Sequence, residues 1–404
     1  MSKKRILVYG LSNIFGGVES IVLSIINRMP DYYNFTIILP KGECSYSDKF
    51  HSSNICIVSM TAWGKNPFNF RKEMSEFLKH ENFDYVWLNL SSLSNITLFK
   101  VLHKYSTAPI VIHSHTVAFE KQGGLKDFLI LMLHYYCQKK YLKAASCLCA
   151  CSKQAAIWMY GDKRNDIKII NNGIDADKFG YADADRMKCR AELNLGSKIV
   201  FLLMGRLCEV KNQSFALDVF NKIHNKCSNV HLLVVGEGDL RSGLEHKCKV
   251  LSLSDNVSFL GFRNDVNFLL QGADVLLIPS LHEGLSLVSI EAQCAGLLCI
   301  ASDGVPEEAK KTELLHFLPL QSGADSWADY ILQLLPYERR THKEEIEKAH
   351  FSIEYTAKEM KDIFIEFEDG LNILSAKNGF GKSTILEMLN YSLFGTQALR
   401  SSVT

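Results

Sequence analysis

The sequence predicts an α/β protein built from two halves, each with its own parallel sheet. Strand-like apolar runs alternate with helical patterns from Arg5 to about Asn172, and the alternation returns from Ile199 to about Leu335. Strands that alternate with helices are typical of parallel sheets covered by helices. A length of 404 residues and a hydrophobic content of 47% suffice for two cores of ordinary size.

In the first half, glycine and histidine residues follow two of the expected strands. Gly16 and Gly17 come after the strand at 5–9, in a loop where glycine lets the backbone approach a ligand closely. The alternative for this pair is a simple turn. His113 and His115 end a later strand and share a face of it, because they are two residues apart.

In the second half, a strand at 199–204 is followed by Gly205, Arg206 and Lys211. Arginine offers a planar fork to phosphate oxygens, whereas lysine is a compact point charge. Both side chains are therefore able to contact phosphate oxygens. The alternative for Arg206 is a salt bridge at the strand end.

Two glutamates follow the next buried strand, at 273–279. Glu283 lies in the loop at its carboxyl end, and Glu291 lies on the helix expected at 286–295. Open α/β sheets bind ligands at this edge, and a helix N-terminus offers N–H groups to a phosphate. A carboxylate on the helix can accept hydrogen bonds from a ribose diol. The alternative is a pair of solvated helix glutamates.

Taken together in order and spacing, these segments resemble the retaining family 4 glycosyltransferases, which have the GT-B fold, over about residues 3–362. The segments that carry the resemblance are Gly16-Gly17-Val18-Glu19, His113-Ser114-His115, Asn172-Gly173-Ile174-Asp175, Gly205-Arg206 with Lys211, Val234-Val235-Gly236-Glu237-Gly238, Val257 to Phe262, and Glu283 with Glu291. The GT-B fold implies two Rossmann-like β/α/β domains that face each other across a cleft. It also implies a last helix that crosses back to the first domain.

The resemblance also implies a domain plan. We expect a Rossmann-like acceptor domain over 1–175 and a nucleotide-sugar donor domain over 176–342. A crossover helix is expected at about 343–363, and a tail at 364–404.

The activity implied by the resemblance is that of a hexosyltransferase. It would move a sugar from a nucleotide diphosphate sugar, with UDP the first expectation and GDP the next, to a hydroxyl of a polysaccharide or lipid-linked glycan, with retention of configuration. Such a reaction would serve capsule or exopolysaccharide biosynthesis. The alternative within this fold is a protein that binds glycans or partners without turnover. The presence of the charged motif residues Arg206, Lys211, Glu283 and Glu291 argues against it.

The resemblance implies roles for individual residues. Arg206 and Lys211 would stabilise the leaving diphosphate, and Glu283 and His115 would contact the donor sugar. Glu291 would bind the ribose, and the remaining residues expected to bind the nucleotide sugar are Gly16, Gly17, Phe262, Gly284, Leu285 and Ser286. His113 is an alternative to His115. We expect no metal and no cofactor, because two fixed cations can meet the diphosphate charge and no Asp-x-Asp pair is placed to hold a metal.

Composition bears on partners and location. Residues 1–150 contain 17 Lys plus Arg against 10 Asp plus Glu, whereas the other residues contain 28 against 34. The basic first half suits an anionic membrane surface or a diphosphate-bearing acceptor, with ordinary solvated lysine as the alternative. No apolar run is long enough to span a bilayer, and the N-terminus has no apolar signal region. We expect a cytoplasmic protein, in contact with the inner face of the cell membrane if the acceptor is lipid-linked, with no nucleic-acid partner.

Cysteines at 147, 149 and 151 alternate along an expected strand. A thiolate metal site is one interpretation, but no second cluster of Cys or His completes a tetrahedron. Core packing as small apolar residues is the other interpretation, and we favour it.

The tail resembles the opening of an SMC, RecF or Rad50-type P-loop ATPase. Its segments are Phe367 to Leu374, with strand character, and Lys377-Asn378-Gly379-Phe380-Gly381-Lys382-Ser383-Thr384. The strict phosphate-loop pattern has glycine where this chain has Ala376. No Walker B carboxylate follows in the sequence, so we expect a fusion remnant that is dispensable for glycosyl transfer. A working ATPase fused to the enzyme is the alternative.

Overall fold

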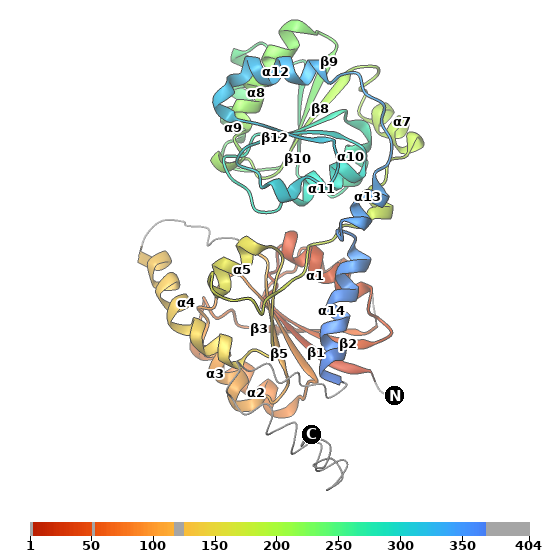
Figure 1. Cartoon of the computed structure of the whole chain (residues 1–404). Helices are drawn as coiled ribbons and strands as arrows, with labels where there is room; N and C mark the ends of the chain where they lie inside the picture. Colours follow the sequence, from red (N-terminus) through yellow and green to blue (C-terminus); the bar gives the residue numbers. More distant parts are fainter. Residues whose placement is uncertain (1–2, 51–52, 117–124, 369–404) are drawn as a thin grey trace, which may run out of the picture. The chain divides into compact units, whose positions relative to one another are not determined.

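The computed structural model describes residues 3–50, 53–116 and 125–368 (Figure 1). Its contacts divide the chain into Met1–Met360 and Lys361–Thr404, and the two sheets belong to the first of these units. All strand pairs in both sheets are parallel. The predicted α/β class, with one parallel sheet in each half, is confirmed.

The first sheet has seven strands in the order β3-β2-β1-β4-β5-β6-β7. Its strands are β1 (Lys4–Tyr9), β2 (Tyr33–Pro40), β3 (Ile55–Met60), β4 (Tyr85–Leu90), β5 (Ile110–Ser114), β6 (Cys147–Ala150) and β7 (Lys168–Ile169). The helices that connect them are α1 (Gly17–Asn27), α2 (Pro67–His80), α3 (Ile96–Tyr105), α4 (Leu125–Ala144) and α5 (Lys153–Tyr160).

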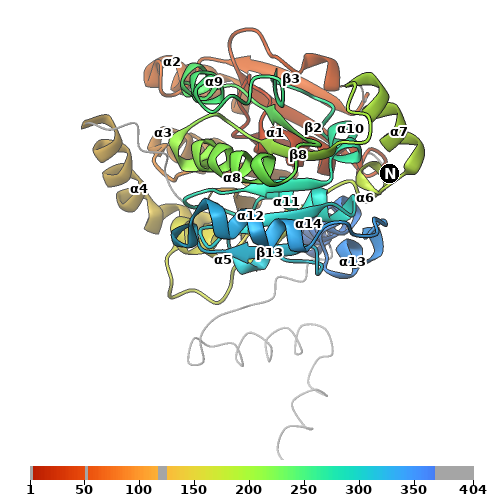
Figure 2. The same ribbon diagram turned by 90° about the horizontal axis from the view of Figure 1, so that it is seen from above.

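The second sheet has six strands in the order β10-β9-β8-β11-β12-β13. Its strands are β8 (Ile199–Met204), β9 (Val230–Val235), β10 (Val257–Gly261), β11 (Val275–Ile278), β12 (Leu298–Ser302) and β13 (Leu315–Leu318). The helices of this half are α6 (Ala176–Phe179), α7 (Asp183–Glu192), α8 (Gln213–Lys226), α9 (Arg241–Val250), α10 (Val266–Gly272), α11 (Leu287–Cys294) and α12 (Gly323–Gln333). Figure 2 shows α8 and α12 side by side, and the two helices contact each other.

In each sheet, successive strands are first added on one side of the first strand and then on its other side. In the first sheet the reversal lies between β1 and β4, and in the second it lies between β8 and β11. At such a switch point the loops after the two strands diverge to opposite faces and leave room for a ligand. The register pairs Val275 with Phe201, so the loops that follow β8 and β11 leave the same edge side by side.

The central strands read as continuous apolar runs because both of their faces are covered. Ile6, Leu7 and Val8 of β1 are fully buried, as are Val200, Phe201 and Leu202 of β8. The cysteines of β6 take part in the same packing. Cys149 is buried, and its Sγ lies 3.7 Å from that of Cys147. Among the described residues, no three His, Cys, Asp or Glu side chains are placed to hold a metal ion.

The helix expected at 343–363 is in fact two helices, α13 (Lys343–Lys348) and α14 (Ile353–Glu368). The break follows from a parallel bridge between Ile174 and Ser352, with Ile174 N bonded to Phe351 O at 2.8 Å and Ile353 N to Ile174 O at 2.8 Å. His350, with φ of 63°, ends the first helix. The strand character expected from Phe367 onwards was wrong for Phe367 and Glu368, which continue α14, while residues 369–404 lie outside the described part.

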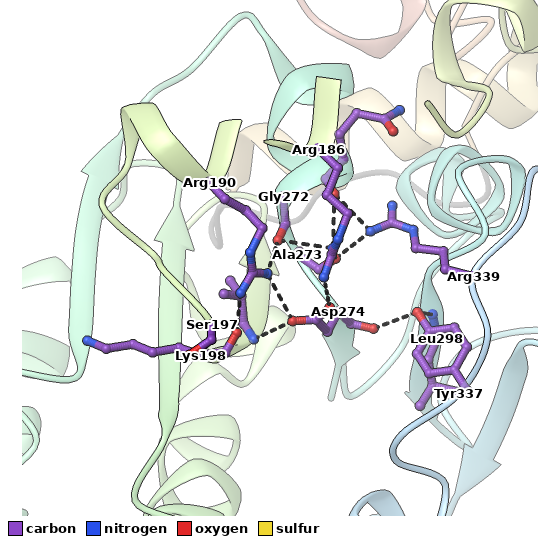
Figure 3. Close-up of polar contacts among 12 residues, drawn as sticks. Arg186, Arg190, Ser197, Lys198, Gly272, Ala273, Asp274, Leu298, Tyr337 and Arg339 are labelled. Atoms are coloured by element: carbon purple, nitrogen blue, oxygen red, sulfur yellow. Dashed lines mark hydrogen bonds and ion pairs between the residues drawn. The ribbon is translucent and has the colours of Figure 1, made fainter. Parts of the chain in front are cut away.

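A polar cluster holds the opposite, amino-terminal edge of the second sheet (Figure 3). Asp274, directly before β11, accepts hydrogen bonds from Arg186 at 2.6 Å, from Arg190 at 3.2 Å and from Val200 N at 2.7 Å. The Arg339 guanidinium donates to the carbonyls that end α10. Burial lowers the pKa of Arg339 to about 10, so it stays charged at neutral pH. The cluster therefore fixes α7 and the segment around Arg339 to the turn between α10 and β11.

Candidate active site

The motif residues of the second half gather at the carboxyl edge of its sheet. Gly205 and Arg206 follow β8, and Gly236 follows β9. Gly236 has φ of 134°, and a Cβ there would lie 2.0 Å from Gly205 O, so only glycine allows the two loops to touch. The Arg206 side chain is exposed at this edge, and its carbonyl accepts a 2.8 Å hydrogen bond from Gln213 Nε2.

Lys211 and Glu283 meet at the switch point. Lys211 Nζ lies 2.5 Å from Glu283 Oε1, and Ser280 Oγ donates to the same oxygen at 2.8 Å. Lysine carries three N–H donors, so two remain for a ligand. Glu283 Oε2 makes no hydrogen bond with another described residue. The pair lines a cavity of about 70 Å³ that Gly205, Gln213 and Ser286 also reach.

The loop that carries Glu283 is held by its neighbours. Glu283 N donates to Gly304 O at 2.9 Å, and Leu281 N donates to Val210 O at 2.8 Å. A Cβ at Gly304 would lie 2.3 Å from Leu281 O, which explains glycine at this contact. The backbone of Glu283 is therefore fixed before any ligand arrives.

The N-terminus of α11 lies directly after Glu283. Ser286 occupies the N-cap position, but its side chain makes no cap hydrogen bond. The first N–H groups of the helix, together with those of Gly284 and Leu285, can therefore serve an anionic ligand, aided by the helix dipole. The prediction that Gly284, Leu285 and Ser286 bind the donor remains a prediction, with this geometry in its favour.

Glu291 lies one turn into α11 and is half-buried. Burial raises the pKa of its carboxyl from 4.5 to about 7, partly opposed by the charge of Lys178 on α6. No hydrogen bond joins this carboxylate to another described side chain. A partly buried carboxylate without a hydrogen-bond partner destabilises the ligand-free protein. The same carboxylate is suited to accept hydrogen bonds from a diol.

We expect Glu291→Gln to weaken donor binding and to stabilise the folded state. Loss of a charge-assisted hydrogen bond should weaken donor binding by roughly ten to a hundredfold in calorimetry. Because the pKa is raised in the folded state, the stability contribution of this carboxyl is full below pH 4.5 and is lost as the pH rises through about 7. The variant should therefore be about 1–3 kcal/mol more stable than the wild type at about pH 8, with most of that gain absent at about pH 5. Equal affinity and equal stability at both pH values would contradict this role.

In the first half, His115 follows β5 and lies beside Asn89 of β4. The distance from His115 Nε2 to Asn89 Oδ1 is 2.9 Å. Burial lowers the pKa of His115 to about 4, partly opposed by a hydrogen bond with Asn172, so the ring is neutral at pH 7. His115 remains the predicted contact to the donor sugar. His113 cannot replace it, because His113 is fully buried beneath the His115 ring, with ring centroids 4.0 Å apart.

Gly16 and Gly17 begin α1, as the strand-to-helix motif predicts. Gly16 is the N-cap with φ of −141°, an extended conformation open to any residue, so the backbone shape does not require glycine there. No atom lies within 4 Å of a Cβ built on Gly17. Glu19 accepts a hydrogen bond from Ser12 N at 2.9 Å and so fixes this loop. A role of the glycines in ligand approach remains a prediction.

A second cavity, of about 290 Å³, lies at the switch point of the first sheet. Among its lining residues are Tyr9, Trp63, Asn89, Ser92 and Asn95. Asn89 is buried, and its Nδ2 has no hydrogen-bond partner within the described part of the chain. Buried donors without a partner are rare in folded proteins. Because Asn89 also lines the cavity, it is a candidate contact for a ligand oxygen.

Sequence reasoning missed several residues of these two cavities. Ser280 and Gln213 hold Glu283 and the Arg206 backbone, but neither belongs to a spaced pattern that would single it out. Trp63 carried a usable signal, because it lies three residues after the end of β3, in a loop with Gly64. Phe262, which was predicted, follows β10 and is 69% exposed, so its ring is free to stack on a nucleotide base.

Two family models match the chain, one in each half. The model described as Glycosyltransferase Family 4 matches residues 15–178, and the one described as Glycosyl transferases group 1 matches residues 198–336. The chain is a GT4-like glycosyltransferase. The predicted family and enzyme class, a hexosyltransferase, are confirmed. A third model, described as an AAA domain, matches residues 353–402, in agreement with the expected ATPase-like tail.

Relatives and solved structures agree with this assignment. The glycosyltransferase is 27% identical over 343 residues to EpsF of Bacillus subtilis strain 168, a protein named as a glycosyltransferase, with 82% of this chain and 87% of the relative aligned. It is 31% identical over 236 residues to the UDP-Gal:alpha-D-GlcNAc-diphosphoundecaprenol alpha-1,3-galactosyltransferase of Escherichia coli, with 56% and 60% aligned.

Among solved structures, Anabaena HepE in complex with UDP and glucose matches with a TM-score of 0.72 at 18% identity, covering 90% of this chain and 100% of that one. Sucrose-phosphate synthase from Thermosynechococcus elongatus matches with a TM-score of 0.71 at 19% identity, covering 91% and 100%. At these identities the likeness shows the fold, and the predicted GT-B fold is confirmed. The predicted domain boundaries stay predictions.

Proposed function

We propose that this glycosyltransferase moves a hexose from a UDP-sugar to a hydroxyl of a polysaccharide or lipid-linked glycan, with retention of configuration and without a metal. The observation that carries the proposal is the meeting of Lys211, Glu283 and the start of α11 at the switch point of the second sheet. The names of similar proteins support the substrate class. HepE is described in complex with UDP-glucose, and the Escherichia coli relative is named for transfer from UDP-Gal to a diphosphoundecaprenol glycan.

The chemistry follows from the charges at this edge. When the glycosidic bond breaks, negative charge grows on the leaving diphosphate, and preorganised cations and N–H groups stabilise it. Arg206 and the two free donors of Lys211 supply the cations, and α11 supplies N–H groups. Glu283 holds the Lys211 ammonium through Oε1 and offers Oε2 to a donor-sugar hydroxyl. Because these cations and N–H groups can meet the diphosphate charge, the proposed reaction needs no metal ion.

A panel of nucleotide sugars tests the donor proposal. A ligand present at about 100 times its dissociation constant should stabilise the folded state by about 2.7 kcal/mol. We expect a thermal shift with UDP-hexoses, and weaker shifts with GDP-, ADP- and CMP-sugars. Product analysis by NMR should then show the same anomeric configuration as the donor. A shift with none of these sugars, or an inverted product, would contradict the proposal.

The acceptor is proposed to enter the cavity at the switch point of the first sheet. Its aromatic and amide lining suits a sugar ring, because Trp63 and Tyr9 offer apolar faces and Asn89 offers an unpaired donor. Trp63 is oriented by a 3.2 Å hydrogen bond from Nε1 to Thr97 Oγ1.

We expect Trp63→Ala to raise the acceptor KM by roughly ten to a hundredfold, the loss of one buried aromatic contact. The affinity for UDP should not change, because Trp63 belongs to the other sheet. Phe68→Ala is the matched control, since Phe68 lies on the neighbouring helix, is 84% exposed and does not line the cavity. Steady-state kinetics with varied acceptor checks the prediction. An unchanged KM would place the acceptor elsewhere.

A lipid-linked acceptor would bring the enzyme to the inner face of the cell membrane. The basic first half, with 17 Lys plus Arg in residues 1–150, supports contact with an anionic surface there. Within residues 3–50, 53–116 and 125–368, no helix is both long and apolar enough to cross a bilayer.

A further inference from the structure

The cavity at the switch point of the first sheet contains a buried hydrogen-bond donor that no described residue satisfies. Asn89 is 3% exposed, and its Nδ2 is the unpaired atom. Its Oδ1 lies 2.9 Å from His115 Nε2, and because an amide oxygen only accepts, the ring N–H donates to it. Glycine after β1 lets the chain pass directly against this residue, since a Cβ on Gly10 would lie 1.7 Å from Asn89 O. Asn89 therefore presents its N–H group from a fixed position.

The lining of this cavity carries no charge. None of the described residues that line it is an aspartate, glutamate, lysine, arginine or histidine. The charged groups beside it are already engaged, because Glu73 accepts from Thr61 N at 2.7 Å and pairs with Lys41. Burying a phosphate, carboxylate or ammonium group without a counter-charge is costly. The cavity therefore suits an uncharged group.

The cavity has a polar mouth and an apolar floor. Gly64 and Ser91 are exposed at the mouth, where Ser92 Oγ and Ser94 Oγ lie 2.9 Å apart. The floor consists of large apolar side chains that are between 1% and 4% exposed, namely Ile38, Leu39, Met60 and Phe70. The volume of about 290 Å³ is at the lower end of small-molecule sites. It suits one sugar ring with a small substituent.

We propose that this cavity binds the acetamido group of an N-acetylhexosamine that serves as acceptor. The acetamido carbonyl accepts the hydrogen bond of Asn89 Nδ2, and the methyl group packs on the apolar floor. The N–H of the same group donates to a serine hydroxyl oxygen at the mouth, which has a lone pair to accept it. A sugar hydroxyl beside Asn89 would also accept, but its own O–H would face the apolar floor, and a buried unpaired donor is costly.

This inference rests on the proposed function, because it names the acceptor of that reaction, but its test measures binding and needs no turnover. Saturation-transfer NMR of the full chain, with and without UDP, compares the methyl glycosides of N-acetylglucosamine, N-acetylgalactosamine, glucose and glucosamine. We expect the acetyl methyl protons to receive the largest saturation. Both acetamido sugars should bind at least about tenfold more tightly than the glucoside, and the amino sugar no better than the glucoside, because its ammonium form is charged.

A variant of the donor residue locates the preference. Asn89→Asp removes the N–H group and keeps an oxygen for His115, so it should weaken binding of the acetamido sugars by roughly ten to a hundredfold. The ratio of acetamido to glucoside affinity should fall to about one. Asn69→Asp is the matched control, because Asn69 is an exposed asparagine of α2 that does not line the cavity. Its ratio should equal that of the wild type, and the Tm should confirm that both variants fold.

Three results would overturn the inference. The first is equal affinity of the wild type for acetamido sugars and the glucoside, and the second is no binding of either acetamido sugar. The third is a folded Asn89→Asp variant that keeps the wild-type preference. The sugar series on the wild type decides the matter if this variant does not fold. Titration with UDP separates the two proposals, because UDP binding without an acetamido preference rejects only this inference, whereas an acetamido preference without UDP binding rejects the proposed donor.

Discussion

Replacing either cation at the switch point of the second sheet, as Arg206→Ala or Lys211→Ala, should lower turnover by about a hundredfold or more. In the proposed reaction both residues lie where charge grows on the leaving diphosphate, so each should contribute more in the transition state than in the ground state. Lys211 has the additional task of pairing with Glu283 at 2.5 Å. Its loss frees that carboxylate to repel the diphosphate, so we expect Lys211→Ala to be the more damaging variant.

The control for this prediction is Lys222→Ala on α8, because Lys222 is a partly exposed lysine of the same half with an ion pair to Asp325. It should keep near-normal turnover. Circular dichroism and the Tm should confirm that all three variants fold. Turnover within about threefold of the wild type in both site variants would refute the site assignment, since loss of a preorganised charge partner costs far more than that.

The largest effect on stability is expected from Asp274→Ala. Its carboxylate, 17% exposed, joins Arg186, Arg190 and the N–H group of Val200 (Figure 3). Removing it leaves partly buried guanidinium groups without their counter-charge at the edge of β8 and β11. Breaking such a pair on one side costs about 3–5 kcal/mol, and chemical denaturation should show a loss near 3 kcal/mol, because the arginines keep their carbonyl partners.

Asp255→Ala is the matched control, because Asp255 is exposed and has no ion pair among the described residues. A surface substitution of this kind changes stability by less than about 0.5 kcal/mol. If Asp274→Ala cost no more than Asp255→Ala, the cluster would be only a surface network of little energetic value.

The strand-to-helix pattern was enough to predict the α/β class with two parallel sheets and to place the motifs, whereas the GT-B fold was predicted from the family resemblance. Apolar runs at 199–204 and 273–279 correspond to β8 and β11, and parallel strands bring the loops after them to one edge. The pairing of Lys211 with Glu283 could not be predicted, because it depends on β11 lying next to β8, and strand order is not written in either segment.

Other features depend on three-dimensional packing. The break between α13 and α14 arises because Ser352 pairs with Ile174, which is far away in sequence, and no helix-breaking residue marks it. The burial that sets the pKa of Glu291 and separates His115 from His113 also comes from neighbouring elements. Such tertiary contacts override local pattern.

If the donor diphosphate binds where β8 and β11 end, titration calorimetry should detect its contacts with Arg206 and Lys211. The affinities of UDP and of uridine are measured for the wild type and for the Arg206→Ala/Lys211→Ala variant. The weaker uridine affinity is obtained from a competition titration. We predict that the double substitution weakens UDP by at least about a hundredfold, because charge-assisted contacts to phosphate are worth about 1.5–3 kcal/mol each, and leaves uridine unchanged. Equal UDP affinity in the two proteins would show that the diphosphate binds elsewhere.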